Sequence, residues 1–260
     1  MSSKRANPKK IPETDSIFEH LTHVHNRSAQ NSRTLRISFD AKATIKLGEL
    51  SRRGKSRIIT KALDHDFLTI EGKVHLLGFY LPEWRETYFF FLPYTTSLTA
   101  DAIVDCLELL LKKLGDFIGC IDRILLNLDN GPENNSRRRQ FIKRLVDFAD
   151  EWGKVVELAY YPPYHSKYNP IERVWGVLEQ HWNGTLLTDL ETVLAMARSM
   201  TYGGVEPVVN VVRKIYNRGV TLCNKAMKVL EKRLHRQEGL ESYAVTIPPL
   251  FSYERGLVIL

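Results

Sequence analysis

Residues 160–183 constrain the fold more than any other stretch of this chain. They run Tyr-Tyr-Pro-Pro-Tyr-His-Ser-Lys-Tyr-Asn-Pro-Ile-Glu-Arg-Val-Trp-Gly-Val-Leu-Glu-Gln-His-Trp-Asn. Pro162 and Pro163 fix the backbone angles and offer no amide donor, so a strand that leads into them must end there. Apolar residues then recur at helical spacing, which predicts an amphipathic helix with one buried face. The stretch therefore predicts a strand, a rigid aromatic loop and a helix in succession.

The start of this predicted helix holds a carboxylate at a fixed place. Asn169 is a good N-cap, Pro170 suits the first helical position, and Glu172 falls in the first turn. The same spacing fits a capping box, in which the Glu172 side chain bonds the backbone amide of Asn169. Trp175 and Trp182 share the spacing of the apolar face, which favours core positions over base stacking. The helix pattern leaves Glu172 open between a capping role and a functional one.

Two aspartates fall at the ends of predicted strands. Residues 35–39 alternate apolar and polar side chains and predict a strand that ends at Asp40. The apolar run 123–128 predicts a buried strand that ends at Asp129, where Asn-Gly-Pro forces a turn. An aspartate before Asn-Gly is more often a turn former than a ligand, so this signal is weak alone. Strand ends and helix starts converge on one edge of a helix-covered sheet, which predicts that Asp40, Asp129 and Glu172 lie together.

Three carboxylates at one edge would repel one another unless a divalent cation neutralised them. Mg²⁺ takes few protein carboxylates and completes its coordination with water and substrate phosphate oxygens. Two such ions roughly 3.5–4 Å apart would activate a nucleophilic water or hydroxyl and stabilise the leaving oxygen of an in-line phosphoryl displacement. The three carboxylates therefore predict a site for Mg²⁺ or Mn²⁺, with two ions expected.

The rest of the pattern predicts an α/β fold. Apolar runs at 74–80 and 87–92 predict strands that are covered on both faces. Residues 100–114 and a segment that begins at Ser136 predict helices, and 155–160 predicts the next strand. We expect a mixed sheet flanked by helices.

Composition shifts divide the chain into parts. Residues 1–34 are polar and predict a tail or linker, and residues 35–184 hold the predicted catalytic core. A basic insertion at about 46–61 is open between a solvated face and a phosphate-contacting one. Residues 185–260 predict a C-terminal helical region and tail, with a basic helical part over about 207–235. One further pair, Asp101 and Asp105, is interpreted as solvated helix charge and not as metal ligands.

Charge and cysteine content indicate where such a chain works. The sequence has 37 Lys and Arg against 30 Asp and Glu, which favours a polyanionic partner. Its three cysteines are scattered without metal-ligand spacing, which suggests reduced thiols. No apolar run approaches the roughly 20 residues that span a membrane. These features predict a cytoplasmic protein.

Two motifs resemble a known family. Residues 128–134 (Leu-Asp-Asn-Gly-Pro-Glu-Asn) and 164–176 resemble the second and third acidic motifs of DDE transposases from bacterial insertion sequences. The resemblance is to the Rhodopirellula-type group, a relative of the mariner-like superfamily. Residues 37–44 resemble the block around its first acidic residue, and 51–56 also resemble that family. The similarity covers roughly residues 9–249, and the third motif is its most specific part.

The resemblance implies a ribonuclease H-like fold in which Asp40, Asp129 and Glu172 form a metal-binding catalytic triad. It implies hydrolysis of a DNA phosphodiester at the element end, followed by joining of the freed 3′-hydroxyl to target DNA. Its partners would be transposon ends and target DNA, and a homodimer is left open. Family members normally carry a helix-turn-helix region ahead of the catalytic domain, and no such segment is expected in this sequence.

Contacts with DNA phosphates would come from basic side chains and from one histidine near Glu172. Lys167 and Arg173 flank that glutamate and are the preferred contacts, with solvated charge as the alternative. His165 is interpreted first as a hydrogen-bonding loop residue, since histidine serves both roles. The candidates are Arg52, Arg53, Lys55, Arg57, Arg137, Arg138, Arg139, His165, Lys167 and Arg173.

Two other functions remain open from the sequence. The chain could be a truncated, inactive transposase remnant that only binds DNA without sequence preference. It could also be a ribonuclease H-like nuclease unrelated to transposition, which the joining reaction would distinguish. The carboxylate triad favours the enzyme, and the expected lack of a recognition region favours the remnant.

Overall fold

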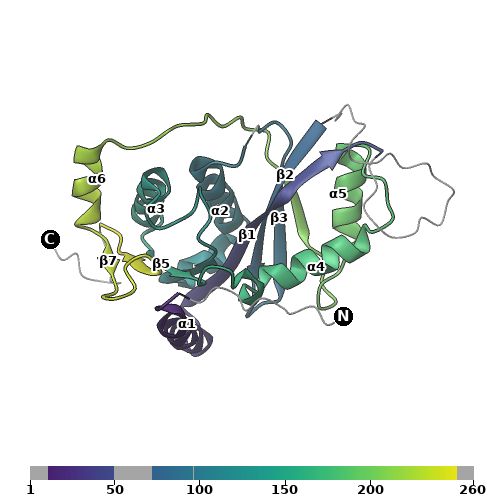
Figure 1. Cartoon of the computed structure of the whole chain (residues 1–260). Helices are drawn as coiled ribbons and strands as arrows, with labels where there is room; N and C mark the ends of the chain where they lie inside the picture. The colour runs from purple at the N-terminus through teal and green to yellow at the C-terminus, as the bar shows by residue number, and fades with distance from the viewer. Residues whose placement is uncertain (1–10, 50–71, 96, 251–260) are drawn as a thin grey trace, which may run out of the picture.

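The computed structural model describes residues 11–49, 72–95 and 97–250, and its strands form one mixed sheet (Figure 1). The strands are β1 (Thr34–Leu47), β2 (Gly72–Leu81), β3 (Glu86–Leu92), β4 (Arg123–Leu128), β5 (Val155–Tyr160), β6 (Val208–Val211), β7 (His235–Arg236) and β8 (Ala244–Ile247). Their order across the sheet is β6-β3-β2-β1-β4-β5-β8-β7. The central strands β1, β4 and β5 are parallel, and β1, β2 and β3 form an antiparallel meander.

Helices cover both faces of this sheet. They are α1 (Thr14–Ala29), α2 (Ala100–Leu114), α3 (Arg139–Trp152), α4 (Ile171–His181), α5 (Leu190–Ser199) and α6 (Asn224–Glu231). Two short 3₁₀ helices, η1 (Gly115–Cys120) and η2 (Ser166–Tyr168), lie in connections. The predicted mixed α/β sheet is therefore confirmed.

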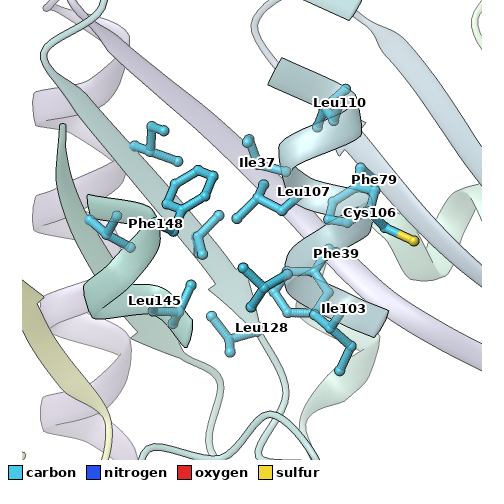
Figure 2. Packing of buried hydrophobic residues seen from close by; sticks show 14 of the residues in the cluster. Ile37, Phe39, Phe79, Ile103, Cys106, Leu107, Leu110, Leu128, Leu145 and Phe148 are labelled. Carbon is cyan, nitrogen blue, oxygen red and sulfur yellow. The ribbon is translucent and has the colours of Figure 1, made fainter. Parts of the chain in front are cut away.

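One face of the sheet is a continuous apolar core. Helices α2 and α3 pack there, and Leu107 of α2 and Phe148 of α3 lie over Ile37, Phe39 and Leu128 of the strands (Figure 2). All five side chains are buried. Successive strand residues point to opposite faces, so the residues between these apolar ones must face the other side.

The opposite face is covered by α4 and α5 over β2 and β3, and by α1 over β4 and β5. Its apolar packing falls into two separate clusters. Ile171 and Trp175 of α4 belong to one, and Ile17 and Leu21 of α1 belong to the other. The predicted core positions of Trp175 and Trp182 are confirmed.

Helix α1 corrects the prediction that residues 1–34 are a tail or linker. Residues 14–29 form a helix whose Ile17, Leu21 and Val24 are buried against β4 and β5. These three positions follow helical spacing, but they are diluted among polar residues, so the periodicity is hard to see. Arg27 also forms an ion pair with the buried Glu157 of β5.

The C-terminal region corrects a second prediction. Residues 185–260 were predicted to be helical, yet they contribute β6 beside β3, and the β7–β8 hairpin beside β5. These strands have two to four residues each, too short to show an alternating pattern. The predicted helix over about 207–235 is reduced to the eight residues of α6.

Two further boundaries differ from the predictions. The predicted strand end at Asp40 is wrong, because β1 continues to Leu47 along β2. The predicted helix from Ser136 begins at Arg139. Most of the basic insertion at 46–61 lies outside the described residues, as do Arg52, Arg53, Lys55 and Arg57.

No described helix combines the length and the hydropathy that a membrane crossing requires.

The predicted solvated charges on α2 are instead ion-paired. Arg144 of α3 lies 3.1 Å from Asp101, 2.8 Å from Asp105 and 2.9 Å from Glu108. Lys214 adds a second contact to Asp105 at 2.6 Å. These carboxylates connect α2 to α3 and to the segment after β6. We name Asp101, Asp105 and Glu108 the α2 cluster.

Candidate active site

Asp40 and Asp129 lie at the same level on neighbouring strands. The parallel pairing of β1 with β4 ends where Ser38 lies opposite Asn127. Asp40 and Asp129 each follow two residues later, just past the end of that pairing. Both residues were predicted to lie at this edge, although β1 itself continues beyond Asp40.

Both aspartates follow residues that face α2 and α3. Ile37, Phe39 and Leu128 belong to the apolar core under α2 and α3. The alternation of the strand therefore turns Ser38 and Asp40 to the opposite face, where α4 packs against β1. The candidate site thus lies on the more polar face of the sheet.

Helix α4 brings the third carboxylate, but its cap differs from the prediction. Glu172 lies in the first turn, as expected. The Asn169 side chain does not cap the helix; instead the backbone N–H of Ile171 donates to the hydroxyl of Ser38 at 3.0 Å. The capping box is also unused, because the Asn169 backbone N–H donates to the Ser166 carbonyl at 2.7 Å.

Asn169 instead links the helix start to both strands. Its side-chain oxygen Oδ1 accepts a bond from Ser38 Oγ at 2.5 Å. Its Nδ2 group donates to the Phe39 carbonyl at 3.2 Å and to Asp129 Oδ1 at 3.4 Å. Asn169 and Ser38 are both fully buried, so these bonds satisfy groups that water cannot reach.

Trp175, one turn after Glu172, contacts Asp40, the carboxylate on β1. Its Nε1–H donates to Asp40 Oδ2 at 3.2 Å, and its ring stacks on Phe89 with centroids 5.4 Å apart. Gly78, which pairs with Asp40 across the strands, makes this possible, since a Cβ there would lie 2.3 Å from the indole. Helical position and a glycine therefore place an indole donor beside Asp40.

The three carboxylates carry uncompensated negative charge. Burial, together with the charges of Asp129 and Glu172, raises the pKa of Asp40 to about 7. Burial and the charge of Glu172 raise the pKa of Asp129 to about 6, although the bond from Asn169 opposes that rise. Within the described part of the chain, no lysine, arginine or histidine forms an ion pair with any of the three.

The carboxylates are near enough to repel, but they are not gathered as a preformed metal cage. Among residues 11–49, 72–95 and 97–250, no three His, Cys, Asp or Glu side chains are close enough to hold an ion. Oxygen donors with excess negative charge suit a hard divalent cation. The donor chemistry therefore fits Mg²⁺ or Mn²⁺, and binding would require the side chains to draw together.

The aromatic loop before α4 packs against the start of α1. His165 is buried, and its Nδ1 lies 2.8 Å from the Pro163 carbonyl. Its ring contacts Phe18 edge-on and stacks on Tyr168. The hydrogen-bonding interpretation of His165 is confirmed, and its burial does not suit a phosphate contact. Tyr164, by contrast, is 70% exposed with a positive φ of 65°.

The remaining basic candidates differ in accessibility. Lys167 and Arg173 are exposed beside the helix start, and Lys167 lies over the Tyr168 ring. Arg137 donates to Ser242, Arg138 pairs with Glu133, and Arg139 donates to the Leu222 carbonyl. These three arginines are engaged in holding the C-terminal region and the loop after β4.

Ser38 was not predicted to belong to the site, and Asn169 and Trp175 were predicted to have other roles. Ser38 alternates with core residues along the strand. That pattern predicts which face of the sheet Ser38 is on, but it does not predict the hydrogen bond with Asn169. Asn169 matched the helix N-cap pattern, and that local pattern concealed its contacts with β1 and Asp129. A signal was present for Trp175, because it lies one helical turn from Glu172.

Comparison with known proteins gives a family and a fold. The family described as Rhodopirellula transposase DDE domain matches residues 1–249. The Mos1 transposase paired-end complex with left transposon end has a similar structure, at 16% identity and a TM-score of 0.50. The match covers 74% of this chain and 56% of that one, so this chain spans little more than half the Mos1 chain.

A second structure is the Mos1 mariner paired-end complex with Mn, at 13% identity and a TM-score of 0.36. That match covers 75% of this chain and 63% of the other. No curated protein matches the chain.

Proposed function

Because this chain belongs to the Rhodopirellula transposase DDE domain family, we propose that it catalyses metal-dependent DNA cleavage and strand transfer. The reaction would hydrolyse a phosphodiester at the end of an insertion sequence. The freed 3′-hydroxyl would then attack a phosphodiester of target DNA. The bond that breaks is the target P–O bond, and the target strand leaves with its own 3′-hydroxyl.

One observation carries the proposal. Asp40, Asp129 and Glu172 come from three different elements and repel one another without a protein cation to offset them. Keeping such an arrangement costs folding free energy. A divalent ion and the phosphate of a substrate would supply the opposite charge and the remaining ligands.

Asp40, Asp129 and Glu172 would hold the metal, with two ions expected. Bound divalent ions supply a lowered pKa for a nucleophilic water and stabilise charge on the leaving oxygen. The chain itself positions the carboxylates through Trp175 and Asn169. The helix start also presents Lys167 and Arg173 on the surface next to Glu172, where a DNA backbone would approach.

DNA binding should depend mainly on phosphate contacts. Such contacts are steeply salt-dependent and carry no sequence information. The Mos1 paired-end complex contains the left transposon end, and we propose that this chain likewise acts on transposon ends. Reversal of Lys167 and Arg173 to Glu should weaken binding to element-end and scrambled duplexes alike.

The alternative is an inactive remnant that binds DNA without cleaving it. The observation that favours it is the lack of a gathered metal cluster among the described residues. A remnant would retain salt-dependent DNA binding and show no metal-dependent chemistry.

A strand-transfer assay separates these functions. The chain would be incubated with Mg²⁺ or Mn²⁺, a pre-nicked element-end duplex and a labelled target. Strand-transfer products that disappear in Glu172→Gln support the transposase. Hydrolysis without joining indicates a nuclease, and binding without either product indicates a remnant.

A further inference from the structure

Asn169 and Ser38 form a buried polar pair at a position where an apolar contact would avoid the cost of burying polar groups. Both have 0% exposure, and they lie between β1 and the start of α4. A buried amide or hydroxyl is costly unless its bonds are satisfied. Here the Ser38 hydroxyl donates to Asn169 Oδ1 and accepts a bond from the Ile171 N–H, so it acts as both donor and acceptor.

The pair touches the element of each proposed metal ligand. Asn169 bonds the Phe39 carbonyl, the residue before Asp40, and it bonds Asp129 Oδ1 directly. Through Ser38 and the Ile171 N–H, the same network sets where α4 begins, and hence the height of Glu172 above the sheet. No other described side chain donates a hydrogen bond to Asp129.

We propose that Asn169 is a positioning residue that fixes the three carboxylates relative to one another, with Ser38 as its support. The proposal rests on the proposed function in assuming that these carboxylates hold metal. Asn169 holds one oxygen of Asp129 and so restricts rotation of that carboxylate. Because the triad is not a closed cage, the pair keeps its members within reach until metal binds.

Asn169→Asp tests this role with almost no change of shape. The substitution removes the donor to Asp129 and places a carboxylate beside it, while Ser38 can still donate. Loss of a group that orients a metal ligand typically costs about 10- to 100-fold in metal affinity or activity. We expect the Mn²⁺ Kd, measured by calorimetry, to rise by about that factor, with the KM for DNA unchanged.

Asn127→Ala is the matched control. Asn127 is also fully buried, but its amide bonds Arg36 and the Ala159 carbonyl. The control should lower the melting temperature and leave the Mn²⁺ Kd as in the wild type. An equal loss of Mn²⁺ affinity in both variants would reduce Asn169 to a general stabilising residue and overturn the proposal.

A metal-free test does not depend on the proposed function. At pH 8, Asp129→Asn should raise the melting temperature more in an Asn169→Asp background than in the wild type. The variant that carries both Asn169→Asp and Asp129→Asn exchanges the amide and the carboxylate between the two positions. It therefore restores a donor and an acceptor that can bond each other. Equal gains in the two backgrounds would show that the side chains are not coupled, and the proposal would fail.

The outcomes separate the two claims. If wild-type chain neither binds Mn²⁺ nor cleaves DNA, the proposed function fails, and the metal-free cycle still decides the contact. If Asn169→Asp does not fold, Ser38→Ala takes its place. That variant should weaken Mn²⁺ binding about tenfold, and an unchanged Kd in Ser38→Ala would overturn the proposal.

Discussion

The α2 cluster and the triad of Asp40, Asp129 and Glu172 are two groups of three carboxylates with opposite electrostatic surroundings. In the α2 cluster, Arg144 contacts every member and Lys214 adds a second cation. Burial alone would raise the pKa of Asp105, but bonds from Lys214, Arg144 and Tyr216 lower it overall. In the triad, burial and mutual repulsion raise the pKa of Asp40 and Asp129.

The difference distinguishes a structural role from a functional one. A compensated cluster connects helices and gains from its charges in the folded state. An uncompensated cluster costs stability, so it is expected where a ligand brings the missing charge. Carboxylates therefore have opposite roles on α2 and at the sheet edge. Their positions in the sequence separated the two groups, but did not reveal that Arg144 pairs with those on α2.

The largest effect is expected on catalysis. Asp40→Asn, Asp129→Asn or Glu172→Gln should each lower cleavage and joining by at least about a thousandfold, because a metal ligand supplies several kcal/mol to the transition state. Asp101→Asn, in the α2 cluster, should leave both rates nearly unchanged. Product yields from labelled DNA give the comparison. Metal-dependent activity retained by any one of the three would remove that residue from the site.

Loss of a compensating cation should have the next largest effect. Arg144→Ala should lower the free energy of unfolding by about 2–4 kcal/mol, because it leaves Asp101 and Glu108 without an ion pair and Asp105 with Lys214 alone. Its sequence neighbour Lys143, whose partner Asp147 is exposed, provides the control. Lys143→Ala should cost no more than about 0.5 kcal/mol. Urea unfolding measures the loss of unfolding free energy in both variants. An equal loss in the two would show that Arg144 is no more important to stability than an exposed lysine.

Metal should stabilise the triad and not the α2 cluster. At a concentration about 100 times its Kd, Mn²⁺ should add about 2.7 kcal/mol to the free energy of unfolding. For a chain of this size, that corresponds to roughly 5–10 °C in melting temperature. The Asp40→Asn/Asp129→Asn variant should lose the shift, and Asp101→Asn should keep it. A full shift in the double variant would place the ion elsewhere.

Without metal, the same substitution should act with opposite sign in the two groups. At pH 8, above the pKa of Asp40, the ionised carboxylate costs folding free energy, so Asp40→Asn should stabilise the chain by about 1–2 kcal/mol. Asp105→Asn should destabilise it, because the lowered pKa of Asp105 means that its charged form favours the folded state. Thermal melts in the presence of a chelator measure the change in melting temperature for both variants. A change of the same sign in both would contradict the proposed difference between the two groups.

Much of the fold was predictable because its strands and helices carry strong local patterns. The apolar runs at β2, β3 and β5 and the periodicity of α2 and α4 matched the structure closely. Helix α1 and the strands β6, β7 and β8 could not be predicted so well. Their stability comes from contact with distant strands, which a local window does not contain.

The candidate site was predictable in its carboxylates and not in their surroundings. Asp40, Asp129 and Glu172 were predicted to be neighbours, although β1 does not end at Asp40 as expected. The ion pairs of Arg144 with α2 and the contacts of Asn169 with β1 join residues far apart in sequence. Such contacts depend on how the helices pack on the sheet, so a local sequence pattern does not predict them.

The claim that Asp40, Asp129 and Glu172 bind a divalent ion is tested most directly by a crystal structure of the chain with Mn²⁺. The anomalous scattering of Mn²⁺ would locate the ion. We expect a peak bounded by Asp40, Asp129 and Glu172, with the three carboxylates drawn closer together than without metal. The α2 cluster should show no peak, because Arg144 and Lys214 already satisfy its charge. A peak at the α2 cluster with none at the triad would contradict the account.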